Sequence, residues 1–191
     1  MHTLNCSDSF WDFSLKVYST SQVPSSCIEL QDSIGLDVNV LLLSLLAVVV
    51  KQRQLTTQEL SDADRFVQSW RDEVVKPIRA LRRRLKPGVA PIPSAISGPL
   101  RDDIKKVELG AEYLQQQALA AWLDELPEGQ ADKFCGQTVV LSTARAVVSF
   151  YLQGLAEADR PDRQQLDERA DTVARAAIQA IPLLNARTEN Q

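Results

Sequence analysis

Residues 30–50 read LQDSIGLDVNVLLLSLLAVVV, and this stretch decides the fold because it holds the most apolar run of the chain. Gly35 predicts the end of one helix in the left-handed conformation. Asp37 predicts the start of the next, since a carboxylate there can accept backbone N–H bonds. The run after it falls short of the roughly 20 residues that a membrane span needs and is broken by Asn39 and Ser44. The sequence therefore predicts a buried central helix at about 38–53.

Four polar residues stand around Gly35, namely Gln31, Asp32, Asp37 and Asn39. Helix capping accounts only for Asp37. Because Asn39 lies in a helix that is otherwise almost wholly apolar, we expect it to be buried and bonded by Gln31 or Asp32. The sequence predicts a structural polar knot at this point, and a binding site at the mouth of the core is the alternative.

Composition favours one helical domain. The 191 residues are 45% hydrophobic and 24% charged, which is typical of a globular chain of this length. Only 7 glycines and 6% aromatic residues stand among many helix formers. We expect an all-α, single-domain bundle of six or seven helices across residues 1–191, with disordered termini at about 1–7 and 183–191.

Hydrophobic periodicity places the helices. Thr56 and Glu59 have the spacing of a capping box, and a long helix follows to about Lys86, which Pro77 should bend. Four prolines and two glycines fall between Lys86 and Pro99, where we expect neither helix nor strand but a crossover at about 87–99. The expected helices lie at about 10–19, 23–34, 38–53, 57–86, 100–126, 138–155 and 163–181.

The net charge of −4 conceals a basic centre. Residues 76–86 read KPIRALRRRLK, with six cations and no acid. On a helix, one side is shared by Arg79, Arg82, Arg83 and Lys86, while Ile78, Leu81 and Leu85 should face the core. The basic side predicts either a groove for an acidic protein or phosphate-bearing partner, or a solvated face that pairs with acidic helices of the same chain.

Several classes of chemistry are not supported. The one histidine is His2, and no phosphate-binding glycine loop or nucleophile elbow occurs, so we expect no cofactor and no metal. Two Asp-x-x-x-Asp pairs remain, Asp8 with Asp12 and Asp167 with Asp171, of the kind that holds magnesium diphosphate in helical prenyl-transferring enzymes. They leave open a small-molecule or diphosphate-binding helical enzyme that uses Asp and Arg clusters.

The segment FWDFSLKVY…VPSSCIELQDSIGLDVNVLLL, residues 10–43, resembles a small uncharacterised family of proteobacterial proteins. Members look like F-W-x-F-S-L followed by Leu-Gln-Asp…Gly-x-Asp-Val-Asn-x-Leu-Leu, and residues 70–86 and 107–119 are also similar. This chain departs by lacking a tryptophan after the leucine run and by having Gly110 in place of an acid. The resemblance implies a bacterial cytoplasmic protein and carries no assigned reaction.

The leading interpretation is a non-enzymatic protein that binds another macromolecule. A nucleic acid partner is not expected, because the chain is acidic overall and the basic run has no interleaved aromatic residues. Three cysteines without a Cys-x-x-Cys pair, and no leader before the first aspartates, predict a cytoplasmic location. Nothing in the sequence fixes the oligomeric state.

Overall fold

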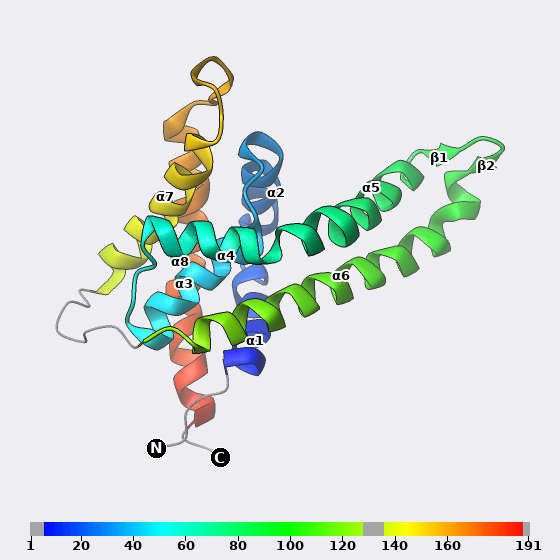
Figure 1. Ribbon diagram of the computed structural model, residues 1–191. Coiled ribbons are helices and arrows are strands. Elements are labelled where there is room, and N and C mark those ends of the chain that lie inside the picture. Colours follow the sequence, from blue (N-terminus) through cyan, green and yellow to red (C-terminus); the bar gives the residue numbers. More distant parts are fainter. Residues whose placement is uncertain (1–5, 128–135, 189–191) are drawn as a thin grey trace.

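The computed structural model describes residues 6–127 and 136–188, with side chains for 10–127 and 136–180 (Figure 1). A body of helices is formed by α1 (Cys6–Tyr18), α2 (Val23–Ile34), α3 (Val38–Lys51), α7 (Gly136–Gln153) and α8 (Arg163–Thr188). A short 3-10 turn, η3 (Glu157–Asp159), separates α7 from α8. The described structure is 82% helical, so the prediction of an all-α single-domain bundle is confirmed.

Helix α3 is the centre of the core. Leu41, Leu42, Leu43, Leu45 and Leu46 are all completely buried, so α3 is covered on every side by its neighbours. Its start is as predicted, because the Asp37 carboxylate accepts bonds from the backbone N–H groups of Asn39 (2.8 Å) and Val40 (3.4 Å). Gly35, with φ +67°, ends α2 as predicted. These two signals fix the turn that sends α3 into the core.

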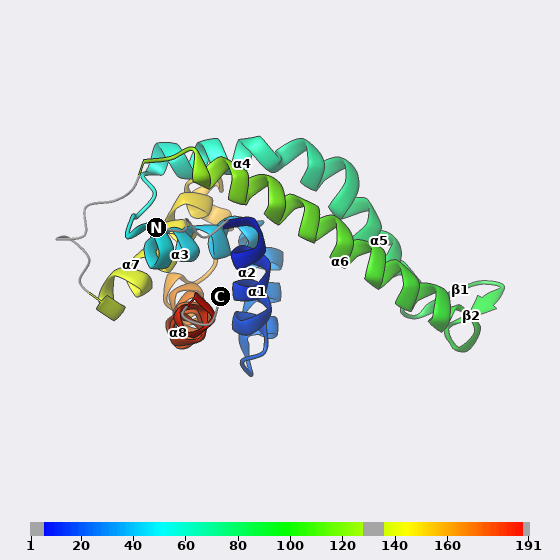
Figure 2. The ribbon, with the colours of Figure 1, turned by 90° about the horizontal axis from the view of Figure 1, so that it is seen from below.

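A long pair of helices runs along one side of the body and continues beyond it (Figure 2). Its first rod is continuous through α4 (Thr57–Trp70), the π-helix η1 (Arg71–Val75) and α5 (Lys76–Leu85). The second is α6 (Ser94–Asp124), and a two-stranded hairpin, β1 (Gly88–Val89) with β2 (Ile92–Pro93), joins them. We call residues 57–124 the arm, with its root on the body and its tip at the hairpin.

The start of the arm carries the predicted capping box. The Thr56 hydroxyl accepts from the backbone N–H of Glu59, and the Glu59 carboxylate accepts from the backbone N–H of Thr56. Pro77 lies in the first turn of α5, two residues after the end of η1, so the irregular turn precedes the residue that lacks a backbone N–H. The end of the arm is tied to α3, since the Lys51 ammonium donates to the carbonyl oxygens of Asp124 (3.1 Å) and Leu126 (3.0 Å).

The prediction of a proline-rich crossover at 87–99 is wrong. This segment turns back on itself at the tip, and α6 already begins at Ser94 and continues through Pro99. Gly88 makes the turn possible: its φ is +85°, and an added Cβ would stand 2.6 Å from the backbone nitrogen of Ser94. Prolines therefore mark a hairpin here and not a linker.

Two other expectations also differ from the structure. Leu81 does not face the core but is 50% exposed on the arm. Helix α8 does not stop before Pro182 but continues to Thr188. Of the terminal ranges expected to be disordered, residues 1–5 and 189–191 lie outside the described residues.

Among the described helices, none is both long and apolar enough to cross a membrane by itself. Only α2 and α3 taken together pass that test, and they are bent by 119° at the break between them.

We predict that Leu42→Ala lowers the free energy of unfolding by about 3 kcal/mol, because a fully buried side chain leaves a cavity that its neighbours cannot close. Urea denaturation followed by circular dichroism measures the loss. Leu15→Ala is the control, since that side chain is 49% exposed and should change stability by about 0.5 kcal/mol or less. Equal losses in the two variants would contradict the central position of α3.

Candidate functional site

Asp37 joins the body to the root of the arm. One oxygen of its carboxylate caps α3, and the other accepts from Arg71 of η1 at 3.1 Å and from Gln115 of α6 at 2.7 Å. The residue is only 6% exposed, so a charge at the start of α3 is buried against the arm. Because Arg71 and Gln115 come from the two rods of the arm, Asp37 holds both rods at once.

Arg71 extends this contact into a network. Its guanidinium also binds the Asp64 carboxylate of α4, which accepts at 2.5 Å from the hydroxyl of Tyr151 on α7. Burial disfavours the charged form of Arg71, but the hydrogen bond to Asp64 and the charge of Asp37 outweigh it and raise the pKa of Arg71. Burial, with the charges of Asp37 and Asp64, raises the pKa of Tyr151. We call Asp37, Asp64, Arg71, Gln115 and Tyr151 the root network.

The predicted partners of Asn39 are wrong. Its side-chain oxygen accepts from Gln116 at 2.8 Å, and Gln116 in turn accepts from the hydroxyl of Ser14 at 3.1 Å. Gln31 has no side-chain bond in the part of the chain that the structure describes, and Asp32 faces the arm. The polar knot therefore exists around Asp37 and Asn39, but Gln115 and Gln116 complete it from about 77 residues away.

Most of the predicted basic side is neutralised within the chain. Arg79 donates to Glu108 at 2.8 Å and also binds Glu112, and Arg82 binds the same Glu108. All four side chains lie where α5 packs along α6, and Glu108 is only 5% exposed. The interpretation of this side as a pairing face is therefore correct for Arg79 and Arg82.

The two acids of this cluster have opposite pKa shifts. Burial would raise the pKa of Glu108, but hydrogen bonds from Arg82 and Arg79 outweigh it, so the pKa is lowered. Burial raises the pKa of Glu112, and the attraction of Arg79 does not fully offset it. Glu108 is thus the carboxylate that the ion pairs of the arm depend on.

The outer part of the basic side keeps its charge. Arg83 meets Asp32 at 3.0 Å, yet both side chains are about half exposed, so the pair is weak. Lys86 has no charged partner among the described residues. Arg101 and Lys105 lie seven and three positions before Glu108, hence on the side of α6 that faces Arg82, and Lys86 follows Arg82 by one turn. We call Arg83, Lys86, Arg101 and Lys105 the basic edge.

Another face of the arm is apolar. It carries six large side chains that are each half exposed or more: Phe66, Leu81, Ile96, Leu100, Val107 and Leu114. Successive residues of a helix differ by about 100°, so Leu81 and Val107 turn away from the side that holds the neighbouring Arg82–Glu108 pair. The apolar face and the basic edge are thus different surfaces of the arm.

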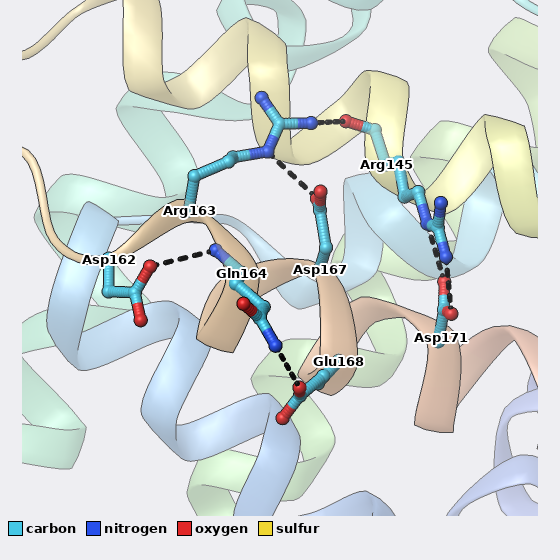
Figure 3. A pocket seen from close by; sticks show the side chains of 7 residues that line it. All are labelled: Arg145, Asp162, Arg163, Gln164, Asp167, Glu168 and Asp171. Atoms are coloured by element: carbon cyan, nitrogen blue, oxygen red, sulfur yellow. Dashed lines mark hydrogen bonds and ion pairs between the residues drawn. The ribbon is translucent and has the colours of Figure 1, made fainter.

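The second predicted aspartate pair lies at an open cleft of about 620 Å³ between α7 and α8 (Figure 3). Asp171 accepts two bonds from Arg145, at 2.8 and 2.7 Å, and Asp167 accepts from Arg163 at 2.8 Å. Since an arginine occupies each carboxylate, the pair does not present two free ligands to a metal. The side chain of Asp8, from the other pair, lies outside the described residues.

The remaining candidate groups of the described chain are metal-ligating clusters and the Cys27 thiol. No group of three or more His, Cys, Asp or Glu there could hold a metal ion. Cys27 is 2% exposed, and burial raises the pKa of its thiol to about 11, so it is protonated at neutral pH. Cys27 therefore occupies the position of a small buried hydrophobic residue.

The geometry defines a class: a helical protein whose body carries a long two-helix arm with a basic edge that is only partly paired and an exposed apolar face. The chain belongs to the family described as Protein of unknown function (DUF2390), which matches residues 9–119. No curated protein matches the chain, and no solved structure does. The matched residues run from α1 into α6 and contain the arm to Leu119, whereas the cleft of Figure 3 lies outside them.

We predict that Arg71→Met lowers the free energy of unfolding by about 3 kcal/mol, because it leaves the buried Asp37 and Asp64 carboxylates without their cation. Arg65→Met is the matched control on α4: its pair with Asp62 is exposed and should contribute about 0.5 kcal/mol or less. Chemical denaturation measures both. A loss no larger at Arg71 than at Arg65 would mean that the root network does not hold the arm.

Glu108→Gln should cost about 2 kcal/mol at pH 7 through the lost charge-assisted bonds to Arg79 and Arg82. A folded-state pKa below the unfolded value gives stability above the unfolded pKa, about 4.3, which is lost as pH falls through the folded pKa. The difference from the unsubstituted protein should therefore shrink as pH falls below about 4.3, as urea titrations can measure.

Glu112→Gln is the control for that experiment, because the pKa of Glu112 is shifted the other way and its ionisation is disfavoured by folding. Its cost at pH 7 should be smaller than that of Glu108→Gln. A cost of Glu108→Gln that is the same at pH 3 and pH 7 would contradict the assignment of the ion pairs.

Proposed function

We propose that this protein is a non-enzymatic macromolecular-interaction or regulatory protein that binds an acidic or phosphate-bearing partner through the basic edge of its arm. We also place it in the bacterial cytoplasm. The observation that carries the proposal is the excess of positive charge near the tip, after Glu108 and Glu112 have neutralised Arg79 and Arg82.

The basic edge has the chemistry for such a partner. Lys86 and Lys105 lack a charged partner in the described chain, and Arg101 has only the exposed Asp102 at 3.7 Å. The buried Nε of Arg101 has no hydrogen-bond acceptor there either. Guanidinium groups bind carboxylate and phosphate with two parallel bonds, and clustered cations also steer an acidic partner toward the surface.

The position of the edge favours a macromolecule over a small ligand. The tip extends beyond the body, and the described pockets lie elsewhere, at α7 with α8 and beneath Gln54. The side chains of the basic edge are exposed, except that of Arg101, which is half-buried, whereas small-molecule sites enclose most of their ligand. The arm therefore offers a surface that a large partner can reach.

We predict that Lys105→Glu reduces capture of the partner about fivefold or more, because charge reversal replaces an attraction by a repulsion. Tagged protein is recovered from its native host, and bound proteins and small molecules are quantified by mass spectrometry at two salt concentrations. Lys16→Glu, an exposed lysine on α1, makes the same change in net charge away from the arm.

The partner that depends on Lys105 should be acidic or phosphorylated and should be released by salt. If both variants retain the same partners as the unsubstituted protein, the basic edge is not a binding surface. Recovery of a small molecule in place of a macromolecule would support an enzyme or ligand carrier and contradict the proposal.

A further inference from the structure

The apolar face of the arm follows helical spacing and has no partner from the described chain. On α6, the positions 96, 100, 107 and 114 fall on one side, at intervals of four, seven and seven residues. Their exposures are 67%, 56%, 59% and 54%. Apolar residues with this period are typical of a helix face that packs against another helix.

The other rod of the arm completes the same face. Trp70 donates its indole N–H to the carbonyl oxygen of Ala111 at 3.0 Å, which places Trp70 beside Ala111 and hence near Leu114, three residues further on α6. Phe66 lies one turn before Trp70, and Leu81 lies on α5 toward the tip. The face thus spans both rods and runs most of the length of the arm.

Gly110 gives a second indication that a helix covers this face. It lies in the middle of α6, where glycine costs about 1 kcal/mol relative to alanine. An added Cβ would meet nothing within 4 Å, so no contact inside the chain requires a glycine. A residue without a side chain at this position suits the close approach of a second helix.

We propose that the apolar face binds the same face of a second copy of this chain, with the two arms antiparallel about a twofold axis near residue 105 of α6. In that register Leu100 of one copy lies opposite Gly110 of the other, and Ile96 lies opposite Leu114. The large side chain at position 100 then meets the gap that glycine leaves. A face that is complementary to itself is what a twofold interface requires.

Asp103, which lies within the face between Leu100 and Val107, and Lys106 at the edge of the face fit the same arrangement. Asp103 and Lys106 are both exposed and bind each other at 2.8 Å in one chain. They lie on opposite sides of the proposed axis at nearly equal distances, so each can meet its opposite charge on the second copy. Like charges at positions 103 and 106 would repel each other across the axis, whereas Asp103 of one copy and Lys106 of the other attract.

The size of the face is sufficient for a weak dimer. From Ile96 to Leu114 the face is about 27 Å long, and two helices side by side are about 20 Å wide. It would bury about 500 Å² of each copy and about 1,000 Å² in total, which is where specific interfaces begin. We expect a reversible dimer with a dissociation constant on the order of 10 µM.

Sedimentation velocity of the whole chain over about 1–200 µM tests the proposal. The unsubstituted protein should pass from monomer to dimer, and Val107→Glu should weaken the dimer at least tenfold because it buries a charge in the interface. Leu109→Glu is the matched control, since Leu109 is also exposed but is turned by about 160° from the face, and its dimer should be unchanged.

Gly110→Ala distinguishes an effect on packing between two copies from an effect on the stability of each copy. It should raise the melting temperature of the monomer, because alanine favours the helix, while it weakens the dimer by occupying the close approach. The orientation is tested in a Cys6→Ser, Cys135→Ser background that keeps Gly110, where mild oxidation should link Ile96→Cys of one copy to Leu114→Cys of the other when the two variants are mixed. Linkage of Ile96→Cys to itself would indicate parallel arms and overturn the antiparallel pairing.

Three other results would overturn the proposal. The protein could remain a monomer throughout the concentration range. A dimer could form that Val107→Glu leaves intact, which would place the interface elsewhere. Finally, monomeric protein could sediment with phosphatidylcholine–phosphatidylglycerol vesicles and lose that binding in Val107→Glu, which would make a lipid surface the occupant of the face.

Discussion

The Asp37 carboxylate is the group on which the architecture depends. It caps the buried helix α3 and at the same time accepts from Arg71 and Gln115, one on each rod of the arm. A carboxylate that is almost wholly buried requires a cation and hydrogen bonds close by. The direction of the arm relative to the core is therefore set by the need to satisfy one charge.

The π-helix η1 supplies the geometry for this contact. Its first residue is Arg71, whose carbonyl oxygen accepts the backbone N–H of Lys76 five residues later. The additional residue in that turn changes which side chains face α6 in the rest of the rod. As a result one continuous rod presents Arg71 to Asp37 at the root and Arg79 with Arg82 to Glu108 further out.

Local signals in the sequence were sufficient for the helix ends of the body. Gly35, Asp37 and the pair Thr56 with Glu59 act on backbone groups within four residues, so their roles follow from spacing alone. The partners of Asn39 and Asp37 could not be found in this way. Gln116 lies 77 residues from Asn39 and Gln115 lies 78 residues from Asp37, and only the packing of α6 brings them near.

The prolines at the tip of the arm gave a prediction that was correct only locally. They indicate the absence of regular helix, but they do not determine the path of the chain. They do exclude regular helix from residues 87–93, yet a tight hairpin satisfies that constraint as well as a crossover does. A hairpin differs from a crossover in that the two flanking helices pack on each other. The residues that hold α6 against α5 here, Glu108 and Glu112 with Arg79, are distant in sequence, so local signals do not show this packing.

Hydrophobic periodicity also does not show what a helix face packs against, as Leu81 illustrates. Its spacing from Ile78 and Leu85 correctly indicates a helix, but the period does not say whether other atoms cover that side of the helix, and Leu81 is 50% exposed. In this protein the core consists mainly of α3 and its neighbours, and the apolar face of the arm remains exposed outside it. The side chains of a two-helix arm can bury only the inner side of each rod against the other. An outer apolar face on such an arm is therefore explained by a further helical surface, and one that is complementary to itself needs only a second copy.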